Sequence, residues 1–406
     1  MRRLSIRRAT PHLGLAALLV TGLACGGGEE SGGDPCSYES GTAYTWAGVK
    51  GSSGLTPDGI HRSESWLGFA SDLTWGPDGR AWIVDWNNHV IRRVEADDTM
   101  VTVIGTDYEG DGPPGEVDRL PEGNPEGALA TEVALNHPTD IEFLSDGTLV
   151  LAAWHNNKIR LMDPETEIVT VLAGNSYGYA GDDGPAWAAL FNQPKSLAID
   201  EDDNIYTIDQ RNERIRFIDH SDTPTIHTVA GTGEIGYTGD GGPALDAQFH
   251  FDIKPTPDPS GALALRDGVL YIADTLNHCI RTMNLETGVV ESIAGTGEAG
   301  YSGDGGDALE ARFDGPLDIE FGPDGMLYIA DAWNNAIRAL DLDSGIINTV
   351  AGNGKQCDAV INCYEEDENV NPLDLQLLTP YGIAFDPAGD LYIADTNNSR
   401  IVKVTR

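Results

Sequence analysis

Residues 293–340 read IAGTGEAGYSGDGGDALEARFDGPLDIEFGPDGMLYIADAWNNAIRAL, and most of the chain consists of variants of this stretch. A short β-type run ends in Ala-Gly-Thr-Gly, and a loop rich in Gly and Asp follows. Two apolar runs, separated by a Pro-Asp-Gly turn, come next, and an Asp-x-x-Asn-Asn loop with a last Ile-Arg run completes the unit. Four short strands in a unit of roughly 55–65 residues are typical of a β-propeller blade.

One spacing recurs six times along the chain. The position that opens the first strand of each unit lies 13 residues before the position that closes the second: Asp72/Asp85, Asp140/Ala153, Ser196/Asp209, Gly261/Asp274, Asp318/Asp331 and Gly382/Asp395. Turn sequences such as Gly-Pro-Asp-Gly lie between the two positions, and Pro and Gly favour tight hairpins there. We therefore predict an all-β fold of six four-stranded antiparallel blades.

Several segments resemble the NHL-repeat family of six-bladed propellers, and its exported bacterial members in particular. The matching motifs are IADTLNHCIR at 272–281, IADAWNNAIR at 329–338, IADTNNSRI at 393–401, VAGTGEIGYTGDGGPA at 229–244 and IAGTGEAGYSGDGGDA at 293–308. The resemblance extends from about Thr42 to the C-terminus. It implies the fold but no particular activity, because one architecture hosts many functions.

The first 40 residues have the features of an export signal and a tether. Four arginines within the first eight residues precede an apolar run at 13–23 that is too short to span a bilayer. Cys25 follows Gly-Leu-Ala and precedes a Gly-rich polar stretch, which resembles a bacterial lipoprotein processing site. We expect a signal peptide at 1–24, a flexible tether with a lipidated Cys25 at 25–40, and the propeller at 41–406. The protein would then be held in the periplasm or at the outer cell surface, or be secreted if it is cleaved without lipidation.

The other cysteines fit an oxidising compartment. Cys357 and Cys363 share one loop, so we predict a local disulfide between them. The sequence leaves open whether Cys36 pairs with Cys279 or whether Cys279 is a buried thiol.

The charge balance limits the partners. With 65 acidic and 25 basic residues the formal net charge is −40, so nucleic acid and anionic lipid surfaces are poor partners. A well-solvated surface is the ordinary explanation of this acidity, and a cation-rich or high-salt habitat is the alternative. The remaining partners are a protein, a peptide or a glycan, bound by a monomer.

The two ends of the chain predict how the ring closes. The C-terminal unit supplies only three strands, whereas Tyr44–Gly48 matches the strand-ending motifs of other units. Because an open propeller would expose two sheet edges, we expect this N-terminal strand to complete the last blade. The Asp-x-x-Asn loops and the Gly-Asp-Gly-Gly loops then lie at one mouth of the ring, where the longest insertions also fall, and we take this mouth as the functional face.

A set of carboxylates is predicted to face the central channel. Asp72, Asp140 and Asp318 share one position on the innermost strand, and Glu142 and Glu320 follow two residues later on the same sheet face. Such a cluster could hold a hard cation such as Ca²⁺, as in a metal-dependent lyase or lactonase. The alternative, which we favour, is that each Asp binds neighbouring backbone amides or a Lys or Arg.

Three tryptophans recur in the loop between the second and third strands, and they are Trp86, Trp154 and Trp333. Aromatic rings on a rim can stack on a sugar or pack a peptide side chain, although such rings more often fill gaps between blades. We expect these residues to be the leading ligand contacts of an interaction module, and we expect no catalytic residue.

Two further patterns have a structural explanation. An Asp followed seven residues later by an Arg occurs in nearly every unit, as in Asp274/Arg281 and Asp331/Arg338. Because a site is made once and a structural bond in every repeat, we predict buried pairs that hold the loops. His89 and His278 occupy a repeated position after Asn, and no trio of histidines shares a register.

Overall fold

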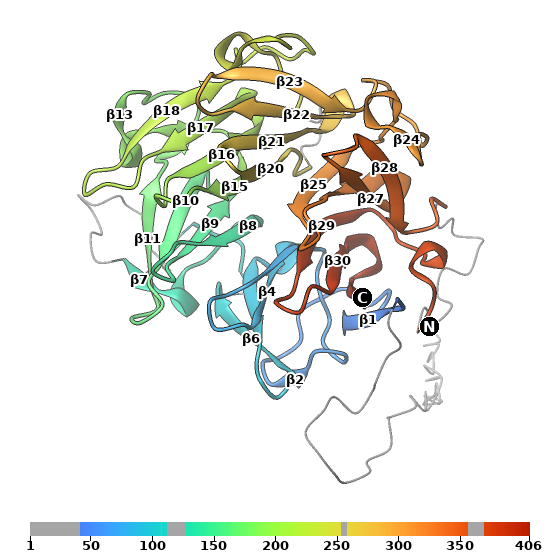
Figure 1. Ribbon diagram of the computed structural model, residues 1–406. Helices are drawn as coiled ribbons and strands as arrows, with labels where there is room; N and C mark the ends of the chain where they lie inside the picture. Colours follow the sequence, from blue (N-terminus) through green and yellow to red (C-terminus); the bar gives the residue numbers. More distant parts are fainter. Residues whose placement is uncertain (1–40, 107, 112–126, 253–257, 356–368) are drawn as a thin grey trace, which may run out of the picture. The chain divides into compact units, whose positions relative to one another are not determined.

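The computed structural model describes residues 41–106, 108–111, 127–252, 258–355 and 369–406, and their main strands form six antiparallel sheets around a centre (Figure 1). From the outer edge inward, blade 1 comprises β2 (Ile60–His61), β6 (Thr99–Ile104), β5 (Val90–Val94), β4 (Ala81–Asp85) and β3 (Ala70–Trp75). Blade 2 comprises β7 (Ala128–Leu129), β11 (Ile168–Ala173), β10 (Lys158–Met162), β9 (Leu149–Ala153) and β8 (Pro138–Phe143). Blade 3 comprises β13 (Gly184–Pro185), β18 (Thr225–Ala230), β17 (Arg214–Ile218), β16 (Ile205–Asp209) and β15 (Pro194–Ile199).

The second half of the ring repeats this order. Blade 4 comprises β19 (Gly242–Pro243), β23 (Val289–Ala294), β22 (Cys279–Asn284), β21 (Val269–Asp274) and β20 (Ala262–Arg266). Blade 5 comprises β24 (Gly306–Asp307), β28 (Ile346–Ala351), β27 (Ala336–Asp341), β26 (Leu327–Asp331) and β25 (Pro316–Phe321). Blade 6 comprises β1 (Ala43–Gly48), β31 (Arg400–Val404), β30 (Leu391–Asp395) and β29 (Pro380–Phe385).

Short elements complete the loops. Among the described residues, five 3-10 turns follow the second long strand of a blade, at the Asp-x-x-Asn position: η1 (Trp86–Asn88), η4 (Gln210–Asn212), η6 (Thr275–Asn277), η8 (Ala332–Asn334) and η10 (Thr396–Asn398). Four others follow the short outermost strands: η2 (Ala130–Glu132), η3 (Ala186–Ala188), η5 (Ala244–Asp246) and η7 (Ala308–Glu310). The last, η9 (Pro372–Asp374), follows Val370, which forms an isolated bridge with Ala43. A parallel pair, β12 (Ser176–Tyr177) and β14 (Leu190–Phe191), forms a sheet of its own.

The six-bladed all-β prediction is confirmed, with one correction. Five blades carry an additional two-residue strand, because the loop that enters a blade first pairs with that blade's own fourth strand. In blade 4, for example, Gly242 and Pro243 lie opposite Val290 and Val289. The blades therefore have four long strands, as predicted, and all except the last have a short fifth strand at the outer edge.

The predicted ring closure is also confirmed. β1 pairs antiparallel with β31, from Ala43 opposite Val404 to Gly48 opposite Arg400. The innermost strands contact one another in chain order, and β29 contacts β3 to complete the circle. The first and last strands of the propeller thus lie in one blade, in which β1 supplies the fourth strand.

Hydrophobic side chains fill the spaces between neighbouring blades. Each of five buried clusters joins two consecutive blades, such as the one in which Ile208 of blade 3 packs with Phe251 and Ile272 of blade 4. At the seam between blades 6 and 1, the ring of Tyr392 meets Trp46 and Trp75 edge-on, at centroid distances of 5.0 and 4.5 Å. Apolar packing between blades therefore stabilises the ring and fixes the walls of the channel.

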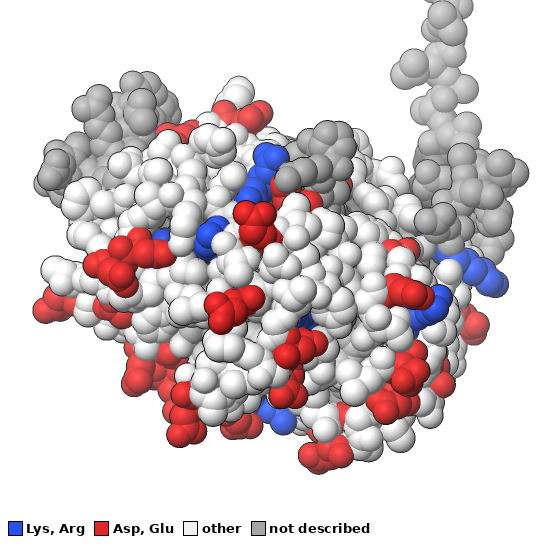
Figure 2. All heavy atoms as spheres, turned by 90° about the horizontal axis from the view of Figure 1, so that it is seen from above, with Lys and Arg blue, Asp and Glu red and all other residues white. Residues whose placement is uncertain are grey.

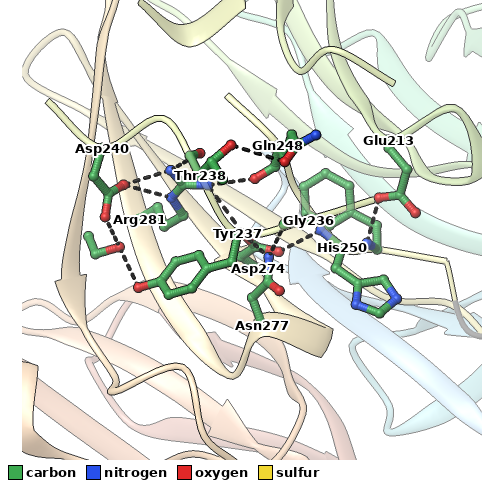
Figure 3. A network of polar contacts seen from close by, with 12 residues as sticks. Glu213, Gly236, Tyr237, Thr238, Asp240, Gln248, His250, Asp274, Asn277 and Arg281 are labelled. Atoms are coloured by element: carbon green, nitrogen blue, oxygen red, sulfur yellow. Dashed lines mark hydrogen bonds and ion pairs between the residues drawn. The ribbon is translucent and has the colours of Figure 1, made fainter. Parts of the chain in front are cut away.

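The predicted Asp–Arg pairs are confirmed as structural bonds, shown for blade 4 in Figure 3. Asp274 accepts hydrogen bonds from the His250 backbone N–H (2.9 Å) and from Asn277 Nδ2 (2.9 Å), and it lies 3.5 Å from Arg281, which is fully buried. The second partner of Arg281 is Asp240 of the Gly-Asp-Gly-Gly loop, at 2.6 Å. An equivalent Asp304–Arg338 pair at 2.7 Å occurs in blade 5. Asp240 and Asp304 of the Gly-Asp-Gly-Gly loops are therefore partners of buried arginines.

Some predictions concern residues outside the described part of the chain. The signal peptide at 1–24, the tether at 25–40 with Cys25, and the Cys357–Cys363 disulfide belong to this group. Cys279 is described, and it is a free, buried thiol. The described residues belong to one compact unit, and no helix among them has the length and apolarity needed to cross a membrane. Acidic side chains are dispersed over the side of the molecule shown in Figure 2.

Candidate functional site: the central channel

The five predicted carboxylates line one cavity of about 150 Å³ in the channel: Asp72, Asp140, Glu142, Asp318 and Glu320. The three aspartates occupy the third position of β3, β8 and β25, and each follows an irregularity in the pairing with the second strand. A bulge of this kind bends a strand and redirects its side chains. Strands from blades 2 and 5 thus present their Asp and Glu to the same space, as the six-fold arrangement predicts.

Two of these aspartates bind the backbone of the next blade. Asp140 accepts a hydrogen bond from the Leu197 N–H at 2.7 Å, and Asp318 accepts one from the Ile383 N–H at 2.8 Å. The hydroxyl of Ser196, at the equivalent position of blade 3, does the same for Leu263. The interpretation that we favoured from the sequence is therefore confirmed for Asp140 and Asp318.

The cavity is strongly acidic for its size. Lys195 is the one cationic side chain among the described residues that line it, and its Nζ donates to the Leu317 carbonyl at 3.1 Å. Burial, with repulsion from Asp318, raises the pKa of Glu320 to about 8, and burial raises the pKa of Asp318 to about 6 although Lys195 opposes this. The pKa values of Asp72 and Glu142 are raised in the same direction by burial and by their acidic neighbours. Near neutral pH the cavity therefore favours protons and hydrogen-bond donors.

The described residues do not form a ready metal site. No group of three or more His, Cys, Asp or Glu side chains among them is arranged to hold a metal ion. One oxygen of Asp140 and one of Asp318 are also already engaged by backbone amides. The Ca²⁺ site at Asp72, Asp140, Glu142, Asp318 and Glu320 stays a prediction, and we derive no reaction step through a metal.

A second cavity, of about 180 Å³, adjoins the first and is lined by loop residues of the mouth that the sequence identifies as functional. We call it the vestibule, and its described lining consists of Phe69, Ser71, Trp86, Asp258, Pro259, Tyr381, Thr396 and Asn397. Ser71 and Tyr381 line both cavities, so the vestibule leads toward the carboxylates. Burial raises the pKa of Tyr381, which keeps its phenol protonated.

The three predicted tryptophans differ in their surroundings. Trp154 is fully buried, and its indole N–H donates to Gln210 at 2.8 Å, so it offers no surface to a ligand and the expectation of direct contact is wrong for this residue. Trp333 is partly buried, and its ring lies so close to Gly315 that a Cβ there would come within 2.5 Å of it. Trp86 is the one of the three that lines the vestibule.

A histidine cluster behind Trp86 was not predicted. The ring of His137 lies 4.4 Å from His89 and 4.8 Å from His155, and it lies 4.4 Å from the ring of Trp86. Burial and the two neighbouring imidazoles lower the pKa of His137 to about 4, so it is neutral at neutral pH. His155 lies at the loop position that Asn87, Arg211, Leu276 and Trp333 occupy in other blades, so no His recurs there and register alone did not bring it together with the other two.

Comparisons with known proteins agree with this fold. The NHL repeat model matches residues 377–404. A stretch of 280 residues is 25% identical to Protein SUPPRESSOR OF QUENCHING 1, chloroplastic, from Arabidopsis thaliana, covering 65% of this chain and 24% of that protein. A stretch of 217 residues is 28% identical to NHL repeat-containing protein 2 from Gallus gallus, covering 48% of this chain and 28% of that protein. The chain thus corresponds to roughly a quarter of each relative's length.

Solved structures share the architecture. An auxiliary nutrient binding protein from Bacteroides thetaiotaomicron superposes with a TM-score of 0.61 at 15% sequence identity, over 89% of this chain and 75% of that one. At this identity the likeness concerns the fold alone. The chain is thus an all-β six-bladed propeller, and its residues 377–404 match the NHL repeat.

Proposed function

We propose that this propeller is an exported binding module that holds a peptide, protein or glycan at the mouth bearing the vestibule. The observation that carries the proposal is the vestibule itself, because an apolar pocket with a few convergent polar groups is the usual form of a ligand site. Its position on a rigid ring, with loops around it, is also the usual place for binding residues.

Backbone strain at the mouth supports the same face. The residue immediately before each innermost strand has a positive φ: Phe69, His137, Gln193, Gly261, Gly315 and Thr379. Glycine adopts this conformation without cost, whereas other residues pay about 1–3 kcal/mol. Four of the six positions nevertheless carry side chains, and one of these, Phe69, lines the vestibule. At Phe69 the strain is kept although glycine would relieve it, and this favours a functional role for the one of these side chains that lines the vestibule.

The binding test compares two tryptophans. Purified protein is applied to glycan and peptide arrays, and Trp86→Ala is expected to lose the captured ligand by at least about tenfold in affinity, as for an aromatic residue at the centre of a site. Trp187→Ala is the matched control, because Trp187 is 37% exposed on η3 at the outer rim. Equal capture by the wild type and Trp86→Ala, for every ligand found, would show that the vestibule is not the binding site.

Export and anchoring form the other half of the proposal, and the sequence at 1–40 supports it. If Cys25 carries the lipid, then Cys25→Ser should move the protein from the membrane fraction to the soluble exported fraction without changing its melting temperature. Retention of the variant in the membrane fraction would contradict lipidation at this residue.

A further inference from the structure

The vestibule contains polar groups that the protein itself does not satisfy. The indole Nε1 of Trp86 and the hydroxyl of Ser71 are both buried, and neither has a hydrogen-bond partner among the described residues. Ser71 is 7% exposed and lies at the junction of the two cavities. Buried polar groups in native proteins nearly always have partners, so two such groups in one wall point to a ligand that supplies acceptors.

The size of the vestibule limits what can enter. Its volume of about 180 Å³ is below the roughly 300–1,000 Å³ that is typical of pockets for drug-sized ligands. The space therefore fits one ring or one side chain. Phe69, Trp86 and Pro259 provide apolar faces for the flat side of such a group.

The charges select among the remaining ligands. No Lys or Arg is among the described residues that line the vestibule, and the carboxylates of Asp72, Asp140 and Asp318 lie in the cavity below it. An anionic ligand would be repelled by Asp258 in the vestibule and by these carboxylates, and Lys195 in the lower cavity is the one opposing charge among the described lining residues. An ammonium group would suit the carboxylates, but it donates only, and it would leave the Trp86 N–H without an acceptor. A hydroxyl group both donates and accepts. A ligand with several hydroxyls can therefore accept from Trp86 and Ser71 and also donate to the carboxylates.

We propose that the vestibule binds a single neutral polyhydroxylated ring, either a monosaccharide or the terminal sugar of a glycan. The apolar C–H face of the ring packs against Trp86 and Phe69. Its oxygens accept hydrogen bonds from the Trp86 indole and the Ser71 hydroxyl, and its hydroxyls donate toward the carboxylates below. This inference rests on the proposed binding function and names its ligand class.

The test is calorimetric titration of the purified protein with D-glucose, D-galactose, D-mannose and N-acetyl-D-glucosamine. D-glucuronate serves as the anionic probe, and D-glucosamine and L-lysine serve as the cationic probes. At least one neutral sugar is expected to bind saturably, and glucuronate is expected not to bind. Trp86→Phe keeps an aromatic ring but removes the N–H. The affinity for the neutral sugar should therefore fall by about threefold to tenfold, which corresponds to the loss of one net hydrogen bond. Trp187→Phe, a similar change on η3 and outside the vestibule, should leave the affinity unchanged.

Ser71→Ala is a second variant, for which we expect the same loss of affinity. Melting curves show whether each of the two variants folds. Binding of a neutral sugar that neither variant weakens would overturn the proposal, as would preferential binding of glucosamine or lysine over neutral sugars. If no neutral sugar binds while a ligand from the arrays is still lost in Trp86→Ala, the sugar assignment fails and the binding module stands. If no ligand of either kind is found, both proposals fail.

Discussion

Buried arginines are the residues on which the loops of this propeller depend. Arg216, Arg281 and Arg338 are fully buried, and each pairs with a carboxylate of its own blade and with one from a preceding loop. A buried charge without a partner is costly, so both carboxylates are needed to keep the guanidinium inside. The same Asp also binds an Asn side chain and a backbone amide, which fixes the loop at the mouth.

Asp274 and Asp240 allow the two partners of one arginine to be compared. Asp274→Ala removes the buried carboxylate that neighbours Arg281 and also the acceptor of the His250 N–H. We therefore expect a loss of about 3–5 kcal/mol in the free energy of unfolding. The side chain of Asp240 is 43% exposed, so water can replace it, and Asp240→Ala should cost only about 1 kcal/mol. Urea denaturation measures both values. Equal losses would mean that burial of the carboxylate does not decide its contribution.

The sequence predicted one partner of each arginine and missed the other. The first Asp lies seven residues before the Arg in a fixed motif, whereas the second lies 34 to 41 residues earlier, as in Asp182/Arg216, Asp304/Arg338 and Asp240/Arg281. The signal was present, because the Gly-Asp loop recurs together with the Arg. His155 had no such signal, because its contact with His137 depends on the packing of two loops and on no repeat.

At the scale of elements, one turn position connects each blade to the next. The last residue of the Asp-x-x-Asn loop is left-handed, and in four blades its side chain accepts the backbone N–H that precedes the next innermost strand. Examples are His89 with His137 at 3.1 Å and Asn335 with Thr379 at 2.8 Å. His278 has the same role toward Gly315. The structural explanation of His89 and His278 from their repeated position is therefore confirmed.

This connection explains which parts of the mouth the sequence could predict. The hairpins, the long strands and the closing strand follow from turn residues, apolar runs and a missing fourth strand, all of which are local patterns. The positive φ before each innermost strand was not visible, because residues as different as Phe, His, Gln, Gly and Thr occupy it. Tertiary hydrogen bonds impose the conformation there, and the type of side chain is left free to vary. The vestibule is built from such a position, so its lining could not be predicted.

At the scale of the whole molecule, the channel concentrates charge that no single blade carries. Blades 1, 2 and 5 each contribute an Asp to the cavity, and blades 2 and 5 add a Glu. The carboxylates are predictable individually from the repeat, but their shared cavity depends on closure of the ring. Their proximity lowers the free energy of unfolding by an amount that depends on pH. The reason is that the carboxyl groups of the folded protein retain protons at pH values where those of the unfolded chain have already lost them.

Glu320 makes this cost measurable. Its pKa is about 8 in the folded protein against an ordinary value of 4.5, so between these pH values the folded state binds more protons than the unfolded state. The free energy of unfolding should therefore fall as the pH rises through this range. His137 has the opposite effect, because its folded pKa of about 4 lies below the ordinary 6.5, but its effect ends near pH 6.5. Between pH 6.5 and 8, the pH dependence of the free energy of unfolding thus reports the acidic groups without a contribution from His137.

In that window we expect the free energy of unfolding of the wild type to decline, and the decline should be smaller in Glu320→Gln. The Gln side chain has nearly the same shape and cannot ionise, so at pH 8 the variant should be more stable than the wild type by about 1–2 kcal/mol. Some decline should remain, because burial also raises the pKa of Glu213 to about 8. Urea denaturation at several pH values gives the slopes, and Glu286→Gln, a change at an exposed position, should keep the wild-type slope. A wild-type profile that is flat or rises from pH 6.5 to 8 would mean that the cavity does not hold the extra proton, because the carboxylates would then be ionised in both states and their burial would leave no trace in the pH dependence.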